Sequence, residues 1–350
     1  MYKRRKTKIV NFSEQPVGGS APISVQSMCN TKTENIKATV KQIKELEAVG
    51  CEIIRVAVPD KKAARAIPEI KARINIPLVA DIHFDYQLAL MAVENGVDAL
   101  RINPGNIGSD RKVKQIAVAC RKKKIPIRVG SNSGSIAKEL LEKYGGPTAE
   151  AMVESALRNV KVLEENNFTD IVISLKSSHI PTTINAYRLM AEKVDYPFHI
   201  GITESGTPWR GTIKSAAGIA SLLTQGFGDT LRVSLTGDPV EEVRVGWQIL
   251  KSLELRKKGV EIISCPTCGR TDIDLIALAE KVEKELLKID KDITVAVMGC
   301  AVNGPGEAKE ADIGVAGGIK EGLIFKEGQI IKKVKEDQLL EELIKEIKKL

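Results

Sequence analysis

Short apolar segments alternate with longer helix-compatible ones eight times between residues 23 and 257. The apolar segments are rich in β-branched residues and too short for stable helices, so they predict β-strands. The longer segments end at glycines, as residues 34–49 do at Gly50 and residues 85–95 do at Gly96. We predict the strands at residues 23–28, 53–58, 78–82, 99–103, 126–130, 170–176, 198–203 and 231–235.

Eight β–α units in about 250 residues are typical of a closed (β/α)8 TIM barrel, which we expect over residues 1–258. An open doubly wound sheet typically has fewer strands and a G-x-G-x-x-G turn after the first one, whereas Q-S-M-C-N-T-K-T stands here. Pro68 should shorten or kink the second helix. Residues 131–150 exceed the length of a connection and should form a lid-like excursion.

Residues 259–350 follow a different pattern and predict a small α+β domain. A strand precedes a helix at 273–288, and a second strand follows at 294–298. The segment L-I-F-K-E-G-Q-I-I-K-K-V predicts a hairpin that turns at Glu327-Gly328. A charged helix with one apolar side should close the chain at 336–350.

Composition limits the possible partners and compartments. The chain is 43% hydrophobic and 28% charged, as soluble globular proteins are, and no segment approaches the length of a membrane span. Its six cysteines are too scattered for a disulfide scaffold, which favours a reducing cytoplasm. The net charge of +8 could suit nucleic acid, but only 4% of residues are aromatic and no binding motif appears. We therefore expect an anionic small molecule, with no nucleic acid and no membrane.

Polar side chains gather at the ends of the predicted strands, where TIM barrels carry their functional groups. Four arginines and a lysine there would be costly to desolvate unless an anion binds among them, and guanidinium groups match phosphate oxygens. Asp81 and Glu204 are candidates for proton transfer, although each could merely anchor an arginine. His199 is expected to be a core or mouth histidine. The polar residues at these strand ends are Arg55, Asp81, His83, Arg101, Asn103, Arg128, Asn132, Ser174, Lys176, Thr203, Glu204, Arg232 and Ser234.

The second domain contains the motifs S-C-P-T-C-G-R and V-M-G-C-A-V-N-G-P-G-E, which include Cys265, Cys268, Cys300 and Glu307. Three thiolates suit zinc or an iron–sulfur cluster. The fourth thiol of a closed zinc ribbon is missing, because no second C-x-x-C follows. A structural zinc site stays an alternative. Cys29, Cys51 and Cys120 are expected to pack as small apolar side chains.

Together these two motifs resemble the cluster motif of the 4-hydroxy-3-methylbut-2-enyl diphosphate synthase family, in its two-domain bacterial form. The resemblance implies a 4Fe–4S cluster held by Cys265, Cys268, Cys300 and Glu307, with Glu307 as the exchangeable ligand at the reacting iron. It implies reductive ring opening and dehydroxylation of 2-C-methyl-D-erythritol 2,4-cyclodiphosphate to 4-hydroxy-3-methylbut-2-enyl diphosphate, in the non-mevalonate isoprenoid pathway. Glu204, and after it Asp81, would act as acid–base residues. The diphosphate would be bound by Arg55, Arg101, Arg128, Asn132, Lys176, Arg232 and Ser234.

Electrons would come from ferredoxin or flavodoxin, because the chain has no nicotinamide or flavin fingerprint. The eighth barrel helix should end opposite the mouth, and the linker after it is too short to lead the second domain back. We therefore expect a homodimer in which each cluster domain caps its partner's barrel, as the resemblance also implies. The alternative enzyme is a pterin-binding-type barrel transferase with structural zinc. An iron–sulfur electron carrier would leave the polar strand ends unexplained.

Overall fold

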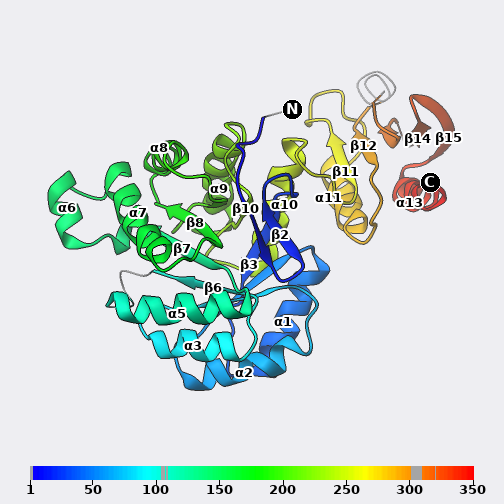
Figure 1. The fold of residues 1–350 in the computed structure, drawn as a ribbon. Coiled ribbons are helices and arrows are strands. Elements are labelled where there is room, and N and C mark those ends of the chain that lie inside the picture. The colour runs from blue at the N-terminus through cyan, green and yellow to red at the C-terminus, as the bar shows by residue number, and fades with distance from the viewer. Residues whose placement is uncertain (1–2, 104–106, 108, 301–309, 320) are drawn as a thin grey trace. The chain divides into compact units, whose positions relative to one another are not determined.

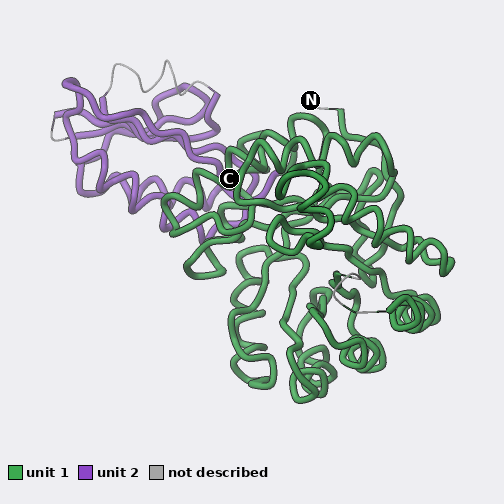
Figure 2. Tube along the Cα trace, turned by 90° about the vertical axis from the view of Figure 1, so that its left-hand side faces the viewer, with its two compact units in different colours: residues 1–256 green, residues 257–350 purple. Residues whose placement is uncertain are grey.

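The computed structural model describes residues 3–103, 107, 109–300, 310–319 and 321–350. The chain divides into two compact units, Met1–Arg256 and Lys257–Leu350, which are coloured separately in Figure 2. Within the described residues, no helix combines the length and apolar character that crossing a membrane requires.

The first unit is a barrel of eight parallel strands, as the sequence predicts (Figure 1). The strands neighbour one another in the order β8-β7-β6-β5-β4-β3-β10-β9, and a parallel bridge between Ile173 and Phe198 joins the two ends. Seven of the eight neighbouring pairs form ladders, so the barrel is nearly closed. The strands are β3 (Ser24–Met28), β4 (Ile53–Ala57), β5 (Leu78–Asp81), β6 (Ala99–Ile102), β7 (Ile127–Asn132), β8 (Ile171–Lys176), β9 (His199–Ile200) and β10 (Thr230–Leu231).

Strands β9 and β10 are shorter than the apolar pattern predicts. Each has two residues, although alternation continues to 203 and 235 in the sequence. Ile202 and Val233 are still buried, so the apolar alternation predicts their burial correctly. Burial does not require a ladder partner, and this is why periodicity overestimates the length of a strand.

Helices cover the outside of the barrel (Figure 1). The second of them, α2, contains Pro68 but runs on to Lys71, so the proline does not end it. Proline has no N–H to donate to the carbonyl four residues earlier, which belongs to Ala64. The side-chain amide of Asn95 donates to that carbonyl instead, at 2.7 Å. The helices are α1 (Ile36–Ala48), α2 (Lys61–Lys71), α3 (Tyr86–Glu94), α5 (Asp110–Lys123), α6 (Lys138–Tyr144), α7 (Ala149–Glu165), α8 (Ile180–Ala191), α9 (Pro208–Leu223) and α10 (Pro239–Ser252).

The excursion predicted at 131–150 begins with the end of β7 and a short 3-10 turn at Ser133–Ser135. The rest of it forms the added helix α6, whose Leu140 is buried. The hydroxyl of Tyr144, at the end of α6, donates to Glu154 on α7 at 2.5 Å. The excursion is therefore a packed helix on the flank of α7.

An N-terminal hairpin, β1 (Ile9–Phe12) with β2 (Gln15–Gly18), was not predicted from the sequence. Its buried side chains pack against residues near the beginnings of four barrel strands. This places an apolar plug at the N-terminal end of the barrel, opposite the mouth. The packed residues are Val10, Phe12 and Val17 of the hairpin with Ile53, Val79, Ala99 and Val172.

The second unit is a mixed sheet with strand order β11-β12-β13-β14-β15, parallel in its first three strands and antiparallel in the last three. The predicted hairpin turn is confirmed, because Glu327 and Gly328 lie between β14 and β15 with φ of 47° and 75°. Two positive φ angles are typical of a type I′ turn. The elements are β11 (Glu261–Ser264), α11 (Leu275–Leu286), β12 (Thr294–Met298), β13 (Ile313–Gly317), β14 (Glu321–Lys326), β15 (Gln329–Lys335), a 3-10 turn (Glu336–Gln338) and α13 (Leu339–Lys349).

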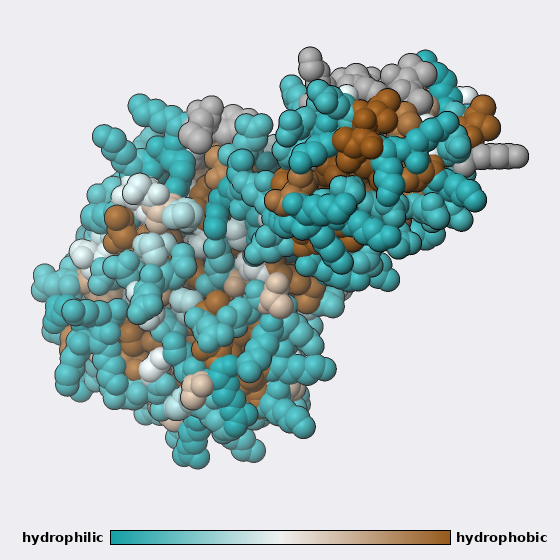
Figure 3. All heavy atoms as spheres, turned by 90° about the vertical axis from the view of Figure 1, so that its right-hand side faces the viewer, coloured by the Kyte–Doolittle hydropathy of each residue, from teal (hydrophilic) through white to brown (hydrophobic). Residues whose placement is uncertain are grey.

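The two units have separate cores. Buried residues from α11, α13 and the sheet form the core of the second unit, and the predicted apolar positions Leu339, Leu343 and Ile347 contribute to it. In the face drawn in Figure 3, hydrophilic residues dominate the surface of the barrel unit, and its apolar residues show as small separate areas.

Candidate active site at the barrel mouth

Five basic side chains come from the barrel strands or, for Arg232, from the residue after β10: Arg55, Arg101, Arg128, Lys176 and Arg232. They lie deep in the barrel, since Arg128 is only 1% exposed and Arg101 and Lys176 are each 8% exposed. Arg101 and Arg128 are register partners on the neighbouring strands β6 and β7. Like charges in register repel one another, so stability alone does not explain this arrangement.

Asp81, at the end of β5, pairs with two of these arginines. Its Oδ1 accepts from Arg101 Nη1 at 3.1 Å, and its Oδ2 lies 3.7 Å from Arg55 Nε and 3.6 Å from His83 Nε2. Burial by itself would raise the pKa of Asp81, but Arg55, His83 and Arg101 outweigh burial and hold it well below its usual range. The carboxylate therefore stays ionised and anchors the arginines, one of the two roles considered from the sequence.

Glu242, on α10, is the second buried carboxylate of the mouth, and sequence analysis missed it. It is 4% exposed and accepts from Leu235 N at 2.9 Å, Ser27 Oγ at 3.3 Å and Arg232 Nη2 at 3.4 Å. A signal was present, because Glu242 occupies an inward position of its helix, next to the buried Val243. A glutamate at such a position indicates a buried partner.

The mouth has an excess of positive charge. Five cations against two carboxylates give 5 − 2 = 3 positive charges when all are ionised. Burial, opposed by Asp81 and reinforced by Arg232 and Arg101, lowers the pKa of Arg55 to about 10. Several buried polar atoms here have no hydrogen-bond partner among the described residues, and such atoms are costly to leave unpaired. They are Gln26 Nε2, Arg128 Nη2, His199 Nδ1 and Arg232 Nε.

Two glycines make room for the cations. A Cβ atom added to Gly130 would lie 3.0 Å from Arg101 Nε, and one added to Gly201 would lie 2.7 Å from Lys176 Nζ. A Cβ atom at Gly201 would also clash with the Arg232 carbonyl oxygen, so both the lysine and the backbone would have to shift, whereas at Gly130 a small shift of Arg101 would be enough. Sequence analysis did not single out these glycines, because only the barrel brings Arg101 against β7 and Lys176 against the end of β9.

The other predicted mouth residues lie in the segments that follow the strands. Glu204 is exposed and has φ of 52°, a strained value for a residue other than glycine. Asn132 ends β7, and its N–H donates to Ser135 Oγ at 3.1 Å. Ser234 is half-buried beyond β10. Glu204 thus combines accessibility with local strain, a combination found at functional sites.

The cysteine motif occupies the ends of two neighbouring parallel strands of the second unit. Cys265 directly follows β11, and its Sγ accepts from Gly299 N, the residue before Cys300, at 3.2 Å. Hydrogen bonding from the backbone N–H of Arg270 lowers the pKa of Cys268, which favours its thiolate. By contrast, burial raises the pKa of Cys29 and of Cys51 to about 12, in agreement with their predicted packing role.

No three His, Cys, Asp or Glu side chains form a metal-binding group within the described part of the chain, and Glu307 lies outside the described residues. The donor set nevertheless fits a soft-metal centre. It supplies thiols at adjacent strand ends, one of them already accepting an N–H···S hydrogen bond of the kind that tunes cluster thiolates.

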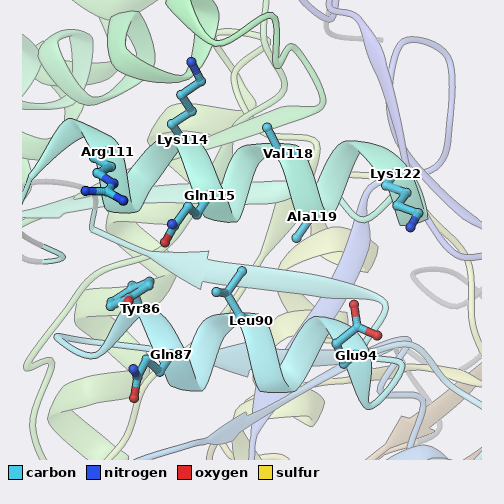
Figure 4. A pocket seen from close by; sticks show the side chains of 10 residues that line it. All are labelled: Tyr86, Gln87, Leu90, Glu94, Arg111, Lys114, Gln115, Val118, Ala119 and Lys122. Atoms are coloured by element: carbon cyan, nitrogen blue, oxygen red, sulfur yellow. The ribbon is translucent and has the colours of Figure 1, made fainter.

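A groove of about 870 Å³ lies away from the mouth, on the outside of the barrel between α3 and α5 (Figure 4). Tyr86 and Leu90 line one side and Val118 the other, with Arg111 and Lys114 on α5. It contains none of the predicted site residues, so it does not change the assignment of the mouth.

Each of the two units matches a known protein family. Residues 7–247 match the family described as GcpE TIM-barrel domain, and residues 261–349 match GcpE protein C-terminal domain. A crystal structure of N-acetylneuraminic acid (sialic acid) synthetase from Leptospira borgpetersenii has a TM-score of 0.51 and 12% identity, covering 82% of this chain and 99% of that one. At this identity the likeness supports the fold alone.

Three full-length relatives share the name 4-hydroxy-3-methylbut-2-en-1-yl diphosphate synthase (flavodoxin). The protein from Clostridium perfringens is 63% identical and covers 98% of both chains. That from Caldanaerobacter subterraneus is 62% identical over 100% of this chain and 99% of its own, and that from Geobacter sulfurreducens is 59% identical over 99% and 98%. The pterin-binding transferase is not supported by these relatives. The chain belongs to the GcpE family, that of the 4-hydroxy-3-methylbut-2-en-1-yl diphosphate synthases.

Proposed function

We propose that this chain catalyses the reductive ring opening and dehydroxylation of 2-C-methyl-D-erythritol 2,4-cyclodiphosphate to 4-hydroxy-3-methylbut-2-enyl diphosphate. The observation that carries the proposal is the buried mouth, with five basic side chains against two carboxylates, in a chain of this family. A dianionic diphosphate offsets the excess charge and accepts from the unpaired guanidinium donors. The residues assigned to its binding are Arg55, Arg101, Arg128, Asn132, Lys176, Arg232 and Ser234.

Glu204 is our candidate for proton transfer, because its side chain is exposed, whereas Asp81 and Glu242 are buried and paired with arginines. Asp81 is the second residue considered for this role. Its contacts with Arg55 and Arg101 support a different contribution, in which it fixes the two guanidinium groups before the substrate binds.

We assign Cys265, Cys268, Cys300 and Glu307 to a 4Fe–4S cluster. When bound, such a cluster supplies the single electrons that a reductive dehydroxylation requires. The relatives' names specify flavodoxin, so we propose flavodoxin rather than ferredoxin as the donor. Reduced thiols are maintained in the cytoplasm, where we expect the reaction.

We also propose a homodimer with two composite sites, for a reason of connectivity. Arg256, the last residue of the barrel unit, donates to the Ile23 carbonyl at 3.0 Å and to Glu52 at 2.7 Å. These acceptors precede β3 and β4, so the chain leaves the barrel on the side opposite the mouth. A partner chain can bring its cluster domain to the mouth, so that no linker has to pass around the barrel.

The test combines product analysis with iron analysis on anaerobically prepared protein. Unsubstituted protein with reduced flavodoxin should convert the cyclic diphosphate, as followed by ³¹P NMR, and should contain several irons per chain. Cys300→Ser should lose both iron and conversion, whereas the control Cys120→Ala should keep both. Conversion at the normal rate by Cys300→Ser, or a colourless protein that contains one zinc, would overturn the assignment.

A further inference from the structure

Lys176 and His199 form a buried pair, in which the proposed function assigns a role to Lys176 but none to His199. Lys176 Nζ lies 3.2 Å from His199 Nε2, and the two residues are 8% and 1% exposed. Tyr187 holds the backbone of this pair, because its hydroxyl donates to the His199 carbonyl at 2.7 Å and accepts from Leu175 N at 3.0 Å. The histidine is thus fixed in place independently of its ring.

The surroundings of the pair are unusual for a lysine. No carboxylate lies within 4.0 Å of Lys176 Nζ among the residues that the structure describes, and its side-chain hydrogen-bond partner is the ring nitrogen Nε2 of His199. Cations outnumber carboxylates on the elements around it. The titratable and charged groups around the pair are Arg55 on β4, Arg101 on β6, Arg128 on β7, Tyr187 on α8 and Arg232 after β10. The two carboxylates of the mouth pair with these arginines, Asp81 on β5 with Arg55 and Arg101, and Glu242 on α10 with Arg232.

We propose that His199 positions Lys176, and that this pair takes up one proton from solvent when the diphosphate enters the mouth. The inference rests on the proposed function, because it requires the mouth to bind a diphosphate. The new bond is an N–H bond on Lys176 Nζ, and solvent or buffer supplies the proton. No electron moves, and the histidine stays neutral.

The physical reason is charge balance. Before the substrate binds, burial and the neighbouring Arg128, Arg232, Arg55 and Arg101 all lower the pKa of Lys176, which shifts its equilibrium toward the neutral amine. Burial, followed by nearby basic groups of which Arg128 is the strongest, lowers the pKa of His199, which favours a neutral imidazole whose Nε2 can hydrogen-bond the lysine. An entering dianion offsets the neighbouring cations and favours the ammonium form again.

The sign of the pH dependence follows from linkage. Because binding takes up a proton, affinity is highest where the empty pair is already protonated and falls as pH rises past that point. The dissociation constant should increase by up to about tenfold per pH unit until the bound pair also loses its proton. A purely structural histidine predicts no proton uptake.

The test is calorimetric titration of the oxidised holoenzyme with the cyclic diphosphate, with no electron donor, so that binding occurs without turnover. The phosphates of this ligand are fully ionised at pH 7 to 9, so any proton taken up is bound by the protein. Titrations at one pH in buffers of different ionisation enthalpy give the number of protons per site. We expect up to one proton, and zero uptake with normal binding would overturn the inference. No binding in any buffer would instead refute the proposed function.

Two substitutions of His199 separate positioning from packing. His199→Gln keeps an acceptor near the Nε2 position and should bind within about threefold of the unsubstituted protein. His199→Leu should weaken binding about tenfold or more and change the proton count. Lys176→Met should abolish uptake. Equal affinity and equal proton uptake in the Leu and Gln variants would contradict the role of His199. If the Leu variant does not fold, unchanged proton uptake in Lys176→Met would still show that the pair does not bind the proton.

Discussion

Arg232 links the ligand-binding role of the mouth to its internal support. Its guanidinium lies 3.4 Å from Glu242 Oε2, and its Nε is buried without a partner in the described chain. One edge of the group is thus fixed while another is free to donate. Support of this kind reduces the entropy that a ligand must remove when it binds.

Arg232→Ala should therefore weaken binding of the cyclic diphosphate by about 1.5–3 kcal/mol, the usual scale for a charge-assisted hydrogen bond. The measurement is the dissociation constant of the oxidised holoenzyme. Arg244→Ala is the matched control, since Arg244 lies half-exposed on α10 and pairs with the surface residue Glu241 at 2.6 Å. Equal affinity in the two variants would remove Arg232 from the binding site.

Asp81 gives a second prediction at the residue scale. Asp81→Asn removes the carboxylate between Arg55 and Arg101, and removing one member of a buried ion pair costs about 3–5 kcal/mol of unfolding free energy. The folded-state pKa is depressed, so the carboxylate stabilises the fold above the unfolded value of about 4. That stabilisation is lost as pH falls from about 4 toward the folded value.

Urea unfolding followed by circular dichroism at several pH values measures this effect. The difference between unsubstituted and Asp81→Asn protein should be constant near neutral pH and should narrow below about pH 4. Asp195→Asn, which removes the exposed ion pair with Lys8, should cost no more than about 1 kcal/mol. A pH-independent difference for Asp81→Asn would show that the carboxylate is not what stabilises the mouth.

At the scale of elements, helix α2 shows how a contact from a neighbouring helix can offset the effect of an internal proline. Pro68 predicts a shortened or kinked helix, yet α2 continues because Asn95, at the end of α3, satisfies the Ala64 carbonyl. The side chain of one helix thus replaces a backbone donor of its neighbour. The contact joins two consecutive β–α units of the barrel.

Asn95→Ala should destabilise the barrel by about 1–3 kcal/mol, because it leaves a buried carbonyl unpaired. The same substitution should cost clearly less in a Pro68→Ala background, where residue 68 regains an N–H for Ala64. The four unfolding free energies of this double-mutant cycle are the measurement. Strict additivity would mean that the Asn95 amide does not compensate for the proline.

At the scale of the whole molecule, the proposed composite sites can be tested by mixing inactive chains. Glu204→Gln protein should be inactive because it lacks the proposed acid–base residue, and Cys300→Ser protein because it lacks a cluster ligand. A hybrid dimer should regain one working site, built from the barrel of the Cys300→Ser chain and the cluster of the Glu204→Gln chain.

The hybrids can be isolated with two different affinity tags, and their rate compared with that of the unsubstituted dimer. About half the normal rate per dimer is expected, since one of two sites is restored. An inactive verified hybrid, or an active monomer, would contradict the composite site. Neither result would contradict the proposed role of the mouth residues in substrate binding.

Much of the fold could be predicted from the sequence because it is encoded locally. Alternating apolar strands and helices predict the barrel, and Glu327-Gly328 predicts the hairpin turn, since each signal lies within one element or one connection. The cysteine motifs and the arginines at strand ends likewise identify the candidate chemistry, because residue type and spacing carry that information. The N-terminal plug went unpredicted, as nothing within its short strands reveals where they pack.

The partners of the mouth residues were decided only by the tertiary structure. Arg128 donates to Gln26, 102 positions away in the chain, and Arg232 meets Glu242 because α10 folds back beside its own strand. Local periodicity shows that a residue is buried, but the closure of the barrel determines which other residues it contacts. For the same reason, the sequence by itself shows that the mouth contains more basic than acidic residues. Only the closed barrel shows that Asp81 and Glu242 pair with the arginines and that His199 contacts Lys176.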